Sequence, residues 1–289
     1  MLTETSFRDT VVEMIRRAET TLPRDVLSAL RRALNREREP LARFHLKMML
    51  ENLSLARKLQ APICQDTGTF TFFVKLGLKR GLRFDLGKAM TEAVKIATRE
   101  VPLRANAVDP LTRRPSPSNT GRDQPAVHIE ITPGKDLELE LLVKGAGTEN
   151  CSRLFMMRPT AGVAAIEEVV LKAIEEAGGK SCPPNIVGVG IGGSMETATL
   201  RAKQALLRPL NVKNPDPELA KLEHRLESSA NKLNIGPMGL GGKTTVLGVR
   251  IEKAACHTAS LPVAVAFQCW PARRSKAKLV NGKLRVVEP

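Results

Sequence analysis

A change in hydrophobic period near residue 60 constrains the fold of this chain more than any other feature. Before that point apolar residues recur every three or four positions, and Pro23 and Pro40 stand where new helices begin. After it, TGTFTFFVKLG (67–77) alternates, as a half-buried strand does. We therefore expect three amphipathic helices that pack on one another within residues 1–60. Their apolar residues are Val11, Val12, Met14, Ile15; Leu27, Leu30, Leu34; and Leu41, Phe44, Met48, Leu55, Leu59.

The rest of the chain mixes helical and strand patterns without regular alternation. Helical periodicity marks 86–99, the stretch from Pro159 to about 176, the residues up to about 207, and 217–232. Strand patterns mark 126–132, 137–145, 186–193, 244–252, 261–268 and a hairpin around Asn281-Gly282. Residues 105–124 are proline-rich and aperiodic, which is typical of a long loop. This order predicts an α+β fold and a single domain over 1–289, with a helical subregion at 1–60.

Composition narrows the class of protein. The longest apolar runs fall short of the ~20 residues that a membrane-spanning helix requires, and the charged first residues lack the apolar core of a secretory signal. We therefore expect a cytoplasmic protein without a membrane partner.

The formal net charge of +15 would suit either a nucleic-acid binder or a protein with acidic ligands. However, the basic residues are spread along the chain, and aromatic residues, which stack on bases, make up only 3%. We expect no nucleic-acid partner. An acidic small substrate, an acidic partner subunit or a general surface effect fits the charge better, and salt-dependent oligonucleotide binding would identify the alternative.

The five cysteines do not form a disulfide framework or a zinc motif. They are widely scattered, odd in number and include no C-x-x-C pair. One of them, Cys64, stands beside Gln65 and Asp66 in the short turn CQDTG (64–68). A structural thiol needs no such neighbours, so this turn indicates a reactive or metal-bound thiolate.

Two glycine-rich stretches are candidate phosphate-binding loops. GVGIGG (188–193) follows a predicted strand and precedes a helix, as in a dinucleotide-binding oxidoreductase, but no acidic residue follows about 20 positions later. Close packing of a helix on the strand explains these glycines as well. GPMGLGGKTT (236–245) carries Pro237 where the P-loop requires glycine, so its spacing fails.

Several ordered motifs resemble one family. CQDTG, LRAN (103–106), NTG (119–121), KGAG (144–147), SCPP (181–184), IGG-x-x-E-T, GGK and H-x-A-S-x-P-V-x-V-x-x-x-C are similar to motifs of the class I, iron–sulfur-dependent fumarate hydratases and the related L-tartrate dehydratases. The resemblance covers about residues 40–280 and is to the alpha subunit of the two-subunit form. It implies an iron–sulfur hydro-lyase alpha-type domain.

By this resemblance, three cysteines hold a [4Fe–4S] cluster, and they are Cys64, Cys182 and Cys269. Cys151 and Cys256 fall outside this ligand set. A cubane with three protein thiolates leaves one iron open to substrate, so that the iron acts as a Lewis acid rather than an electron carrier. One departure is Arg122, which follows NTG where the family tends to have an acidic residue, and we assign no role to that loop.

The resemblance also implies roles at the substrate. Asp66 would be the acid partner at the leaving hydroxyl, Gln65 would hydrogen-bond substrate, and Arg104 would clamp a carboxylate. Substrate would also contact the Gly147 backbone, and His257 would be a substrate-site or proton-relay residue. Structural alternatives remain open, because Asp66 could cap its own turn and Arg104 could pair with the nearby Asp109.

The expected reaction is the reversible hydration of fumarate to (S)-malate, a step of the tricarboxylic acid cycle, with L(+)-tartrate dehydration as the alternative. In the family the base is a threonine of the beta subunit, which this chain lacks. We therefore expect a heteromer, and an alpha chain that holds the cluster but is nearly inactive alone.

Overall fold

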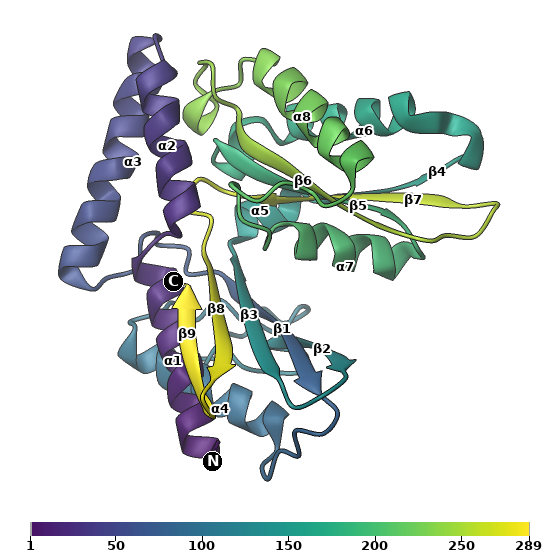
Figure 1. Cartoon of the computed structure of the whole chain (residues 1–289). Helices are drawn as coiled ribbons and strands as arrows, with labels where there is room; N and C mark the ends of the chain where they lie inside the picture. Colours follow the sequence, from purple (N-terminus) through teal and green to yellow (C-terminus); the bar gives the residue numbers. More distant parts are fainter. Residues whose placement is uncertain (1, 289) are drawn as a thin grey trace. The chain divides into compact units, whose positions relative to one another are not determined.

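The computed structural model describes residues 2–288, which fold into two compact units (Figure 1). Unit 1 is built from three separate stretches, residues 2–23, 52–145 and 273–288, and unit 2 from residues 24–51 and 146–272. Each unit contains one mixed sheet with helices packed against it, and the predicted α+β class is confirmed. The prediction of a single domain stays a prediction.

Unit 1 centres on a five-stranded sheet of order β2-β1-β3-β8-β9. Only the β1–β2 pair is parallel, and the other neighbours run antiparallel. The hairpin predicted at Asn281-Gly282 joins β8 to β9, and both of its residues have positive φ, as a tight turn requires. The elements are α1 (Glu4–Thr20), β1 (Thr69–Gly77), α4 (Leu86–Glu100), β2 (Ala126–Thr132), β3 (Leu137–Lys144), β8 (Arg274–Val280) and β9 (Lys283–Glu288).

The core of unit 1 lies between this sheet and the apolar faces of α1 and α4. Thr3 forms a capping box with Ser6 at the start of α1, and Asp85 accepts from the Lys88 N–H at the start of α4. Both helices therefore begin where the sequence supplies a cap, and their apolar residues then fall on the face that the sheet covers.

Unit 2 centres on a four-stranded sheet of order β4-β7-β5-β6. Helices α6 and α8 contribute to a shared core with β5, β6 and β7 on one side of the sheet, and α7 packs on the other (Figure 1). The elements are α2 (Arg24–Arg36), α5 (Ala146–Cys151), β4 (Arg153–Met157), η1 (Pro159–Ala161), α6 (Gly162–Ala177), η2 (Gly178–Ser181), β5 (Asn185–Gly192), α7 (Met195–Ala205), α8 (Pro217–Lys232), η3 (Pro237–Gly239), β6 (Val246–Ala254) and β7 (Leu261–Gln268).

The prediction that the first three helices form one packed unit was wrong for α1, which packs on α4 in unit 1. Helix α2 and the first part of α3 (Pro40–Leu59) both belong to unit 2, where Arg43 donates to the Leu34 carbonyl at 2.8 Å. The apolar residues expected in the core of α3 include four exposed ones, Leu41, Phe44, Leu55 and Leu59. A second set on the same helix is buried instead, namely Ala42, Leu46, Met49, Leu53 and Ala56. The apolar period therefore identified the exposed face of α3 and not the buried one.

The glycines of GVGIGG allow α7 to lie directly on β5. A Cβ added to Gly190 would lie 2.0 Å from the carbonyl oxygen of Ala198, and one added to Gly188 would lie 2.2 Å from that of Ala202. Glycine is therefore needed at both positions for helix packing. This is the structural explanation that the sequence offered beside the dinucleotide motif.

We expect Gly190→Ala to lower the free energy of unfolding by on the order of 3 kcal/mol, because the backbone of α7 must move to admit the new methyl group. Urea denaturation measures it. Gly87→Ala is the control, since Gly87 is exposed in the first turn of α4 and the nearest atom to the new methyl group would be a side-chain oxygen at 3.5 Å; it should change stability by no more than about 1 kcal/mol. Equal stabilities for the two variants would contradict the packing argument.

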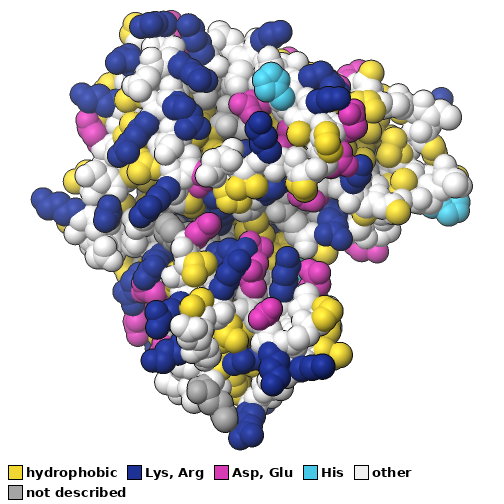
Figure 2. All heavy atoms as spheres, in the orientation of Figure 1, with side chains coloured by type: hydrophobic (Ala, Val, Ile, Leu, Met, Phe, Trp, Pro, Cys, Tyr) yellow, Lys and Arg dark blue, Asp and Glu magenta, His cyan; other side chains and the backbone are white. Residues whose placement is uncertain are grey.

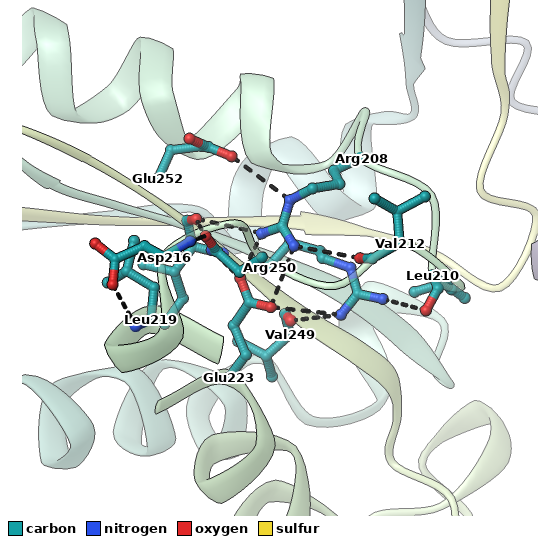
Figure 3. A network of polar contacts seen from close by, with 11 residues as sticks. Arg208, Leu210, Val212, Asp216, Leu219, Glu223, Val249, Arg250 and Glu252 are labelled. Carbon is teal, nitrogen blue, oxygen red and sulfur yellow. Dashed lines mark hydrogen bonds and ion pairs between the residues drawn. The ribbon is translucent and has the colours of Figure 1, made fainter. Parts of the chain in front are cut away.

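A buried charge network fixes the segment between α7 and α8 (Figure 3). Glu223 accepts from both Arg208 terminal nitrogens, from Asn214 at 2.8 Å and from the Ile251 N–H at 2.8 Å. Arg250 lies beside it and donates to the carbonyl oxygens of its neighbours, while burial lowers the pKa of Arg250. A cavity of about 720 Å³ borders the network. Since these charged groups bind one another and the backbone, they brace β6 and the 206–216 segment.

Among residues 2–288, no helix combines the length and the apolar content needed to cross a bilayer. On the face shown in Figure 2, Lys and Arg side chains are scattered with Asp and Glu between them, as the even spread of basic residues along the sequence suggests.

Candidate functional site

The CQDTG turn lies in unit 1, directly before β1, and its aspartate is held by two hydrogen bonds. Oδ1 of Asp66 accepts from the Gly68 N–H at 2.9 Å and from Nδ2 of Asn106 at 3.3 Å. Gly68 has φ +70°, and a Cβ there would lie 2.6 Å from the carbonyl oxygen of Lys144. The turn-capping role considered for Asp66 is thus present. It uses Oδ1, while Oδ2 lies 2.7 Å from where a Cβ on Gly145 would be.

Two asparagines lock the LRAN and NTG loops around this turn. Oδ1 of Asn119 accepts from the backbone N–H of Asn106 at 2.6 Å and of Ala107 at 3.2 Å, and its Nδ2 donates to the Arg104 carbonyl at 2.7 Å. Asn119 is buried and takes a left-handed φ of 55°. Neither residue was predicted from the sequence as one that joins the two motifs.

Arg104 borders the turn with an exposed side chain. Its backbone N–H donates to Oγ1 of Thr67 at 3.1 Å, and its guanidinium donates to the Gln65 carbonyl at 3.4 Å. The alternative partner, Asp109, accepts instead from Leu111 and Thr112, and the Thr112 hydrogen bonds lower the pKa of Asp109. The structure therefore gathers Gln65, Asp66 and Arg104 at one place in unit 1.

A buried ion pair that no sequence pattern predicts lies close to Asp66. Arg273 donates through Nη1 to Oε2 of Glu19 at 2.7 Å, and both side chains are at most 1% exposed. The pKa of Glu19 is raised to about 7 by burial and, to a smaller extent, by the negative charge of Asp66, against the attraction and hydrogen bond of Arg273.

This raised pKa predicts how stability depends on pH. Between the ordinary glutamate pKa of 4.5 and about 7, folded Glu19 keeps a proton that the unfolded chain releases. The free energy of unfolding should therefore fall by on the order of 3 kcal/mol as pH rises through this window. Above about pH 7 it should level off. Glu19→Gln should remove this part of the pH dependence.

Urea denaturation at several pH values between 4 and 9 tests the expectation. Glu51→Gln is the matched control because that carboxylate is exposed, and its profile should follow the wild type. If Glu19→Gln also runs parallel to the wild type, Glu19 does not titrate in this window.

In unit 2, two of the predicted cluster ligands lie next to each other. The Trp270 N–H, adjacent to Cys269, donates to the Cys182 carbonyl at 3.1 Å. Asn185 reinforces this contact from the start of β5, because its Nδ2 donates to the carbonyls of Ser181 and Gln268. Cys182 has a left-handed φ of 52° at the end of η2, ahead of Pro183. This role of Asn185 was not predicted from the sequence, although the residue stands directly after SCPP.

Gly147 belongs to the same region of unit 2. A Cβ on it would lie 2.9 Å from the Lys180 carbonyl, so the start of α5 approaches the loop that carries Cys182 closely. Its backbone therefore lies near the backbone of the segment that leads to Cys182.

Cys64 lies in unit 1, half-buried, where its thiol donates to Oε1 of Gln65 at 3.6 Å. All three predicted ligands are cysteines, and their thiolates are the donors that iron–sulfur clusters use. Within residues 2–288 no three His, Cys, Asp or Glu side chains converge as a single metal ion would require. A cubane differs because its three thiolates bind three different irons, so the donor set fits a cluster in its chemistry.

The other two cysteines have different surroundings. Cys151 is buried in the hydrophobic core of unit 2, and Cys256 is exposed in the loop that joins β6 to β7. These positions are those of a small core residue and a surface thiol.

His257 lies in the same loop, where its Nδ1 accepts from the Ala259 N–H at 3.0 Å. Cys269 follows the opposite end of β7, an eight-residue strand that spans about 25 Å at about 3.3 Å per residue. Within unit 2, His257 and Cys269 therefore stand at opposite ends of one strand. The role of His257 as a substrate-site or proton-relay residue stays a prediction.

Comparison with known proteins identifies the family of the chain. A family model described as Fumarate hydratase (Fumerase) matches residues 8–278. The chain belongs to the fumarate hydratase (Fumerase) family, a class of hydro-lyases.

Its relatives carry a more particular name. A protein of Methanocaldococcus jannaschii named "Putative L(+)-tartrate dehydratase subunit alpha" is 45% identical over 271 residues, which cover 92% of this chain and 95% of that protein. The L(+)-tartrate dehydratase subunit alpha of Escherichia coli UTI89 is 38% identical, covering 90% and 86%. The protein of the same name from Escherichia coli K12 is 38% identical, covering 88% and 84%.

Proposed function

We propose that this chain is the alpha subunit of an iron–sulfur hydro-lyase that dehydrates L(+)-tartrate. The observation that carries the proposal is the similarity, over nine-tenths of the chain, to proteins named as alpha subunits of that enzyme. The sequence motifs favoured fumarate hydration, and that reaction becomes the second candidate, because the family includes it. Both substrates are four-carbon dicarboxylates.

Cys64, Cys182 and Cys269 would hold a [4Fe–4S] cluster. When bound, this cluster would supply a Lewis-acidic iron with an open position for the hydroxyl that leaves. The pairing of Cys182 with Cys269 through Trp270 and Asn185 supports two of these three assignments.

Dehydration removes a hydroxyl group from one carbon and a proton from the next, so it needs an acid and a base. Asp66 would give its proton to the departing hydroxyl. The hydrogen bonds from Gly68 and Asn106 fix its Oδ1, which sets the direction of the carboxyl group. The base would come from the beta subunit, as the family resemblance implies, and His257 is given no step.

Substrate binding would rest on residues beside Asp66. Arg104 is held through its backbone by Thr67 and presents an exposed guanidinium, which suits a bidentate contact with a substrate carboxylate. Gln65 and the Gly147 backbone would add hydrogen bonds to the substrate. A basic protein surface would also draw a dianion toward it.

The experiment is anaerobic purification of the chain, alone and co-expressed with a beta subunit of the same family. We expect iron and sulfide at about four each per chain in both samples. Turnover of L(+)-tartrate should require the beta subunit and exceed the rate on fumarate or malate. A faster rate on fumarate would select the second candidate. Full turnover by the chain alone, or a colourless chain without iron, would refute the proposal.

A further inference from the structure

The Glu19–Arg273 pair is costly to keep in the interior of unit 1. Both charges are withdrawn from water, and the second oxygen of Glu19, Oε1, has no hydrogen-bond partner among residues 2–288. Apolar residues of similar size often replace such a pair without loss of stability. A contribution to stability therefore explains the Glu19–Arg273 pair poorly. The position of the pair within unit 1 suggests a different role.

The backbone of each partner is tied to a segment that borders Asp66. The Glu19 carbonyl accepts from the Ile63 N–H at 2.8 Å, directly before Cys64. The Arg273 carbonyl accepts from the Val143 N–H at 3.2 Å, two residues before Gly145. The pair thus joins the end of α1 to the entrance of the CQDTG turn and to the end of β3.

The side chain of Arg273 reaches the same place. A Cβ on Gly145 would lie 2.7 Å from Oδ2 of Asp66 and 3.8 Å from Nη2 of Arg273. The carboxylate and the guanidinium therefore border one glycine, and any side chain at that position would displace Asp66. Arg273 donates to Glu19 through Nη1, so its other terminal nitrogen is the one that lies toward Asp66.

We propose that Glu19 and Arg273 are positioning residues for Asp66: Glu19 orients the Arg273 guanidinium, and Arg273 fixes the Oδ2 side of the Asp66 carboxylate. Gly68 and Asn106 hold the Oδ1 side, so the carboxyl group is fixed from both ends. This inference deepens the proposed function and rests on it, since it gives Asp66 its orientation for proton transfer. A planar guanidinium can face two carboxylates at once, which the point charge of a lysine cannot do with the same geometry.

Two variants separate positioning from bulk stability. The double substitution Glu19→Leu and Arg273→Met removes both charges while keeping most of the volume, so folding should survive. Arg273→Lys keeps the positive charge but loses the planar guanidinium with its two terminal nitrogens. Glu140→Gln is the matched control, because it breaks a half-buried pair with Lys276 in the same sheet.

In the assembled enzyme we expect both test variants to lower kcat by about 10- to 100-fold, a partial loss of the roughly 10²- to 10⁴-fold that general acid catalysis contributes. KM and iron content should stay within about twofold of the wild type. Glu140→Gln should leave all three quantities unchanged. Wild-type kcat in the double variant would overturn the inference while leaving the proposed function intact, whereas a wild type without iron or turnover would overturn the proposed function itself.

A second readout needs no activity. The Gly68 amide donates to Asp66, so its hydrogen exchange, measured by NMR on the chain alone, reports where the carboxylate lies. We expect faster exchange at Gly68 in Arg273→Lys and none of this change in Glu140→Gln. Unchanged protection of Gly68 in Arg273→Lys would show that Arg273 does not position Asp66, whatever the catalytic outcome.

Discussion

Cys182→Ser should yield a colourless chain that loses its iron and at least about 10³-fold of hydro-lyase activity in the assembled enzyme. Serine keeps the size of the side chain but replaces a soft thiolate by a hydroxyl, which is a poor ligand for an iron–sulfur cluster. Loss of a Lewis acid worth several kcal/mol of transition-state stabilisation sets the scale of the rate effect. Iron and sulfide assays with an absorption spectrum check the first part, and steady-state rates check the second.

Cys151→Ser and Cys256→Ser provide the comparison. One lies in the core of unit 2 and the other is exposed, so both should keep full iron content. Cys151→Ser should cost some stability because it places a hydroxyl among apolar side chains. Retention of iron by Cys182→Ser, or its loss from Cys256→Ser, would mean that the ligand set is wrong.

Arg273→Ala should lower the free energy of unfolding by about 3–5 kcal/mol. It leaves the Glu19 carboxylate in the interior without its cation, and breaking a buried pair from one side carries a cost of this size. An unpaired buried carboxylate takes up a proton more readily, so the loss should be larger at pH 8 than at pH 5. Urea denaturation at both pH values measures this.

The matched control is Arg225→Ala, which removes the partner of Glu167. That arginine is half exposed, and such surface pairs are worth at most about 1 kcal/mol. Equal losses for the two arginine variants would show that burial of the Glu19–Arg273 pair has no special weight.

The sequence predicted what is encoded locally. Alternation and turn residues located β1, β2, β3 and the Asn281-Gly282 hairpin, because side-chain period and a tight turn depend on neighbouring residues. The short elements α5 and β4 were missed, since six and five residues carry too little periodicity to detect.

What the sequence did not predict depends on distant residues. Glu19 and Arg273 are 254 positions apart and meet only because both belong to unit 1. The exposed and buried faces of α3 are both apolar, so nothing within the helix says which one is covered. The candidate site was also predicted only in part. The order of the motifs indicated Cys182, Cys269 and Asp66. The side-chain amides that connect the loops around these residues were not predicted, because they act between distant segments; they belong to Asn106, Asn119 and Asn185.

The discontinuity of unit 1 has a consequence for its synthesis. Strand β8 covers one edge of β3, yet all of residues 146–272 must be translated before β8 exists. At usual elongation rates this interval is on the order of ten seconds. During it the nascent chain presents an unpaired strand edge, the kind of surface on which chaperones act and aggregates start. A need for folding assistance is therefore expected of the newly made chain.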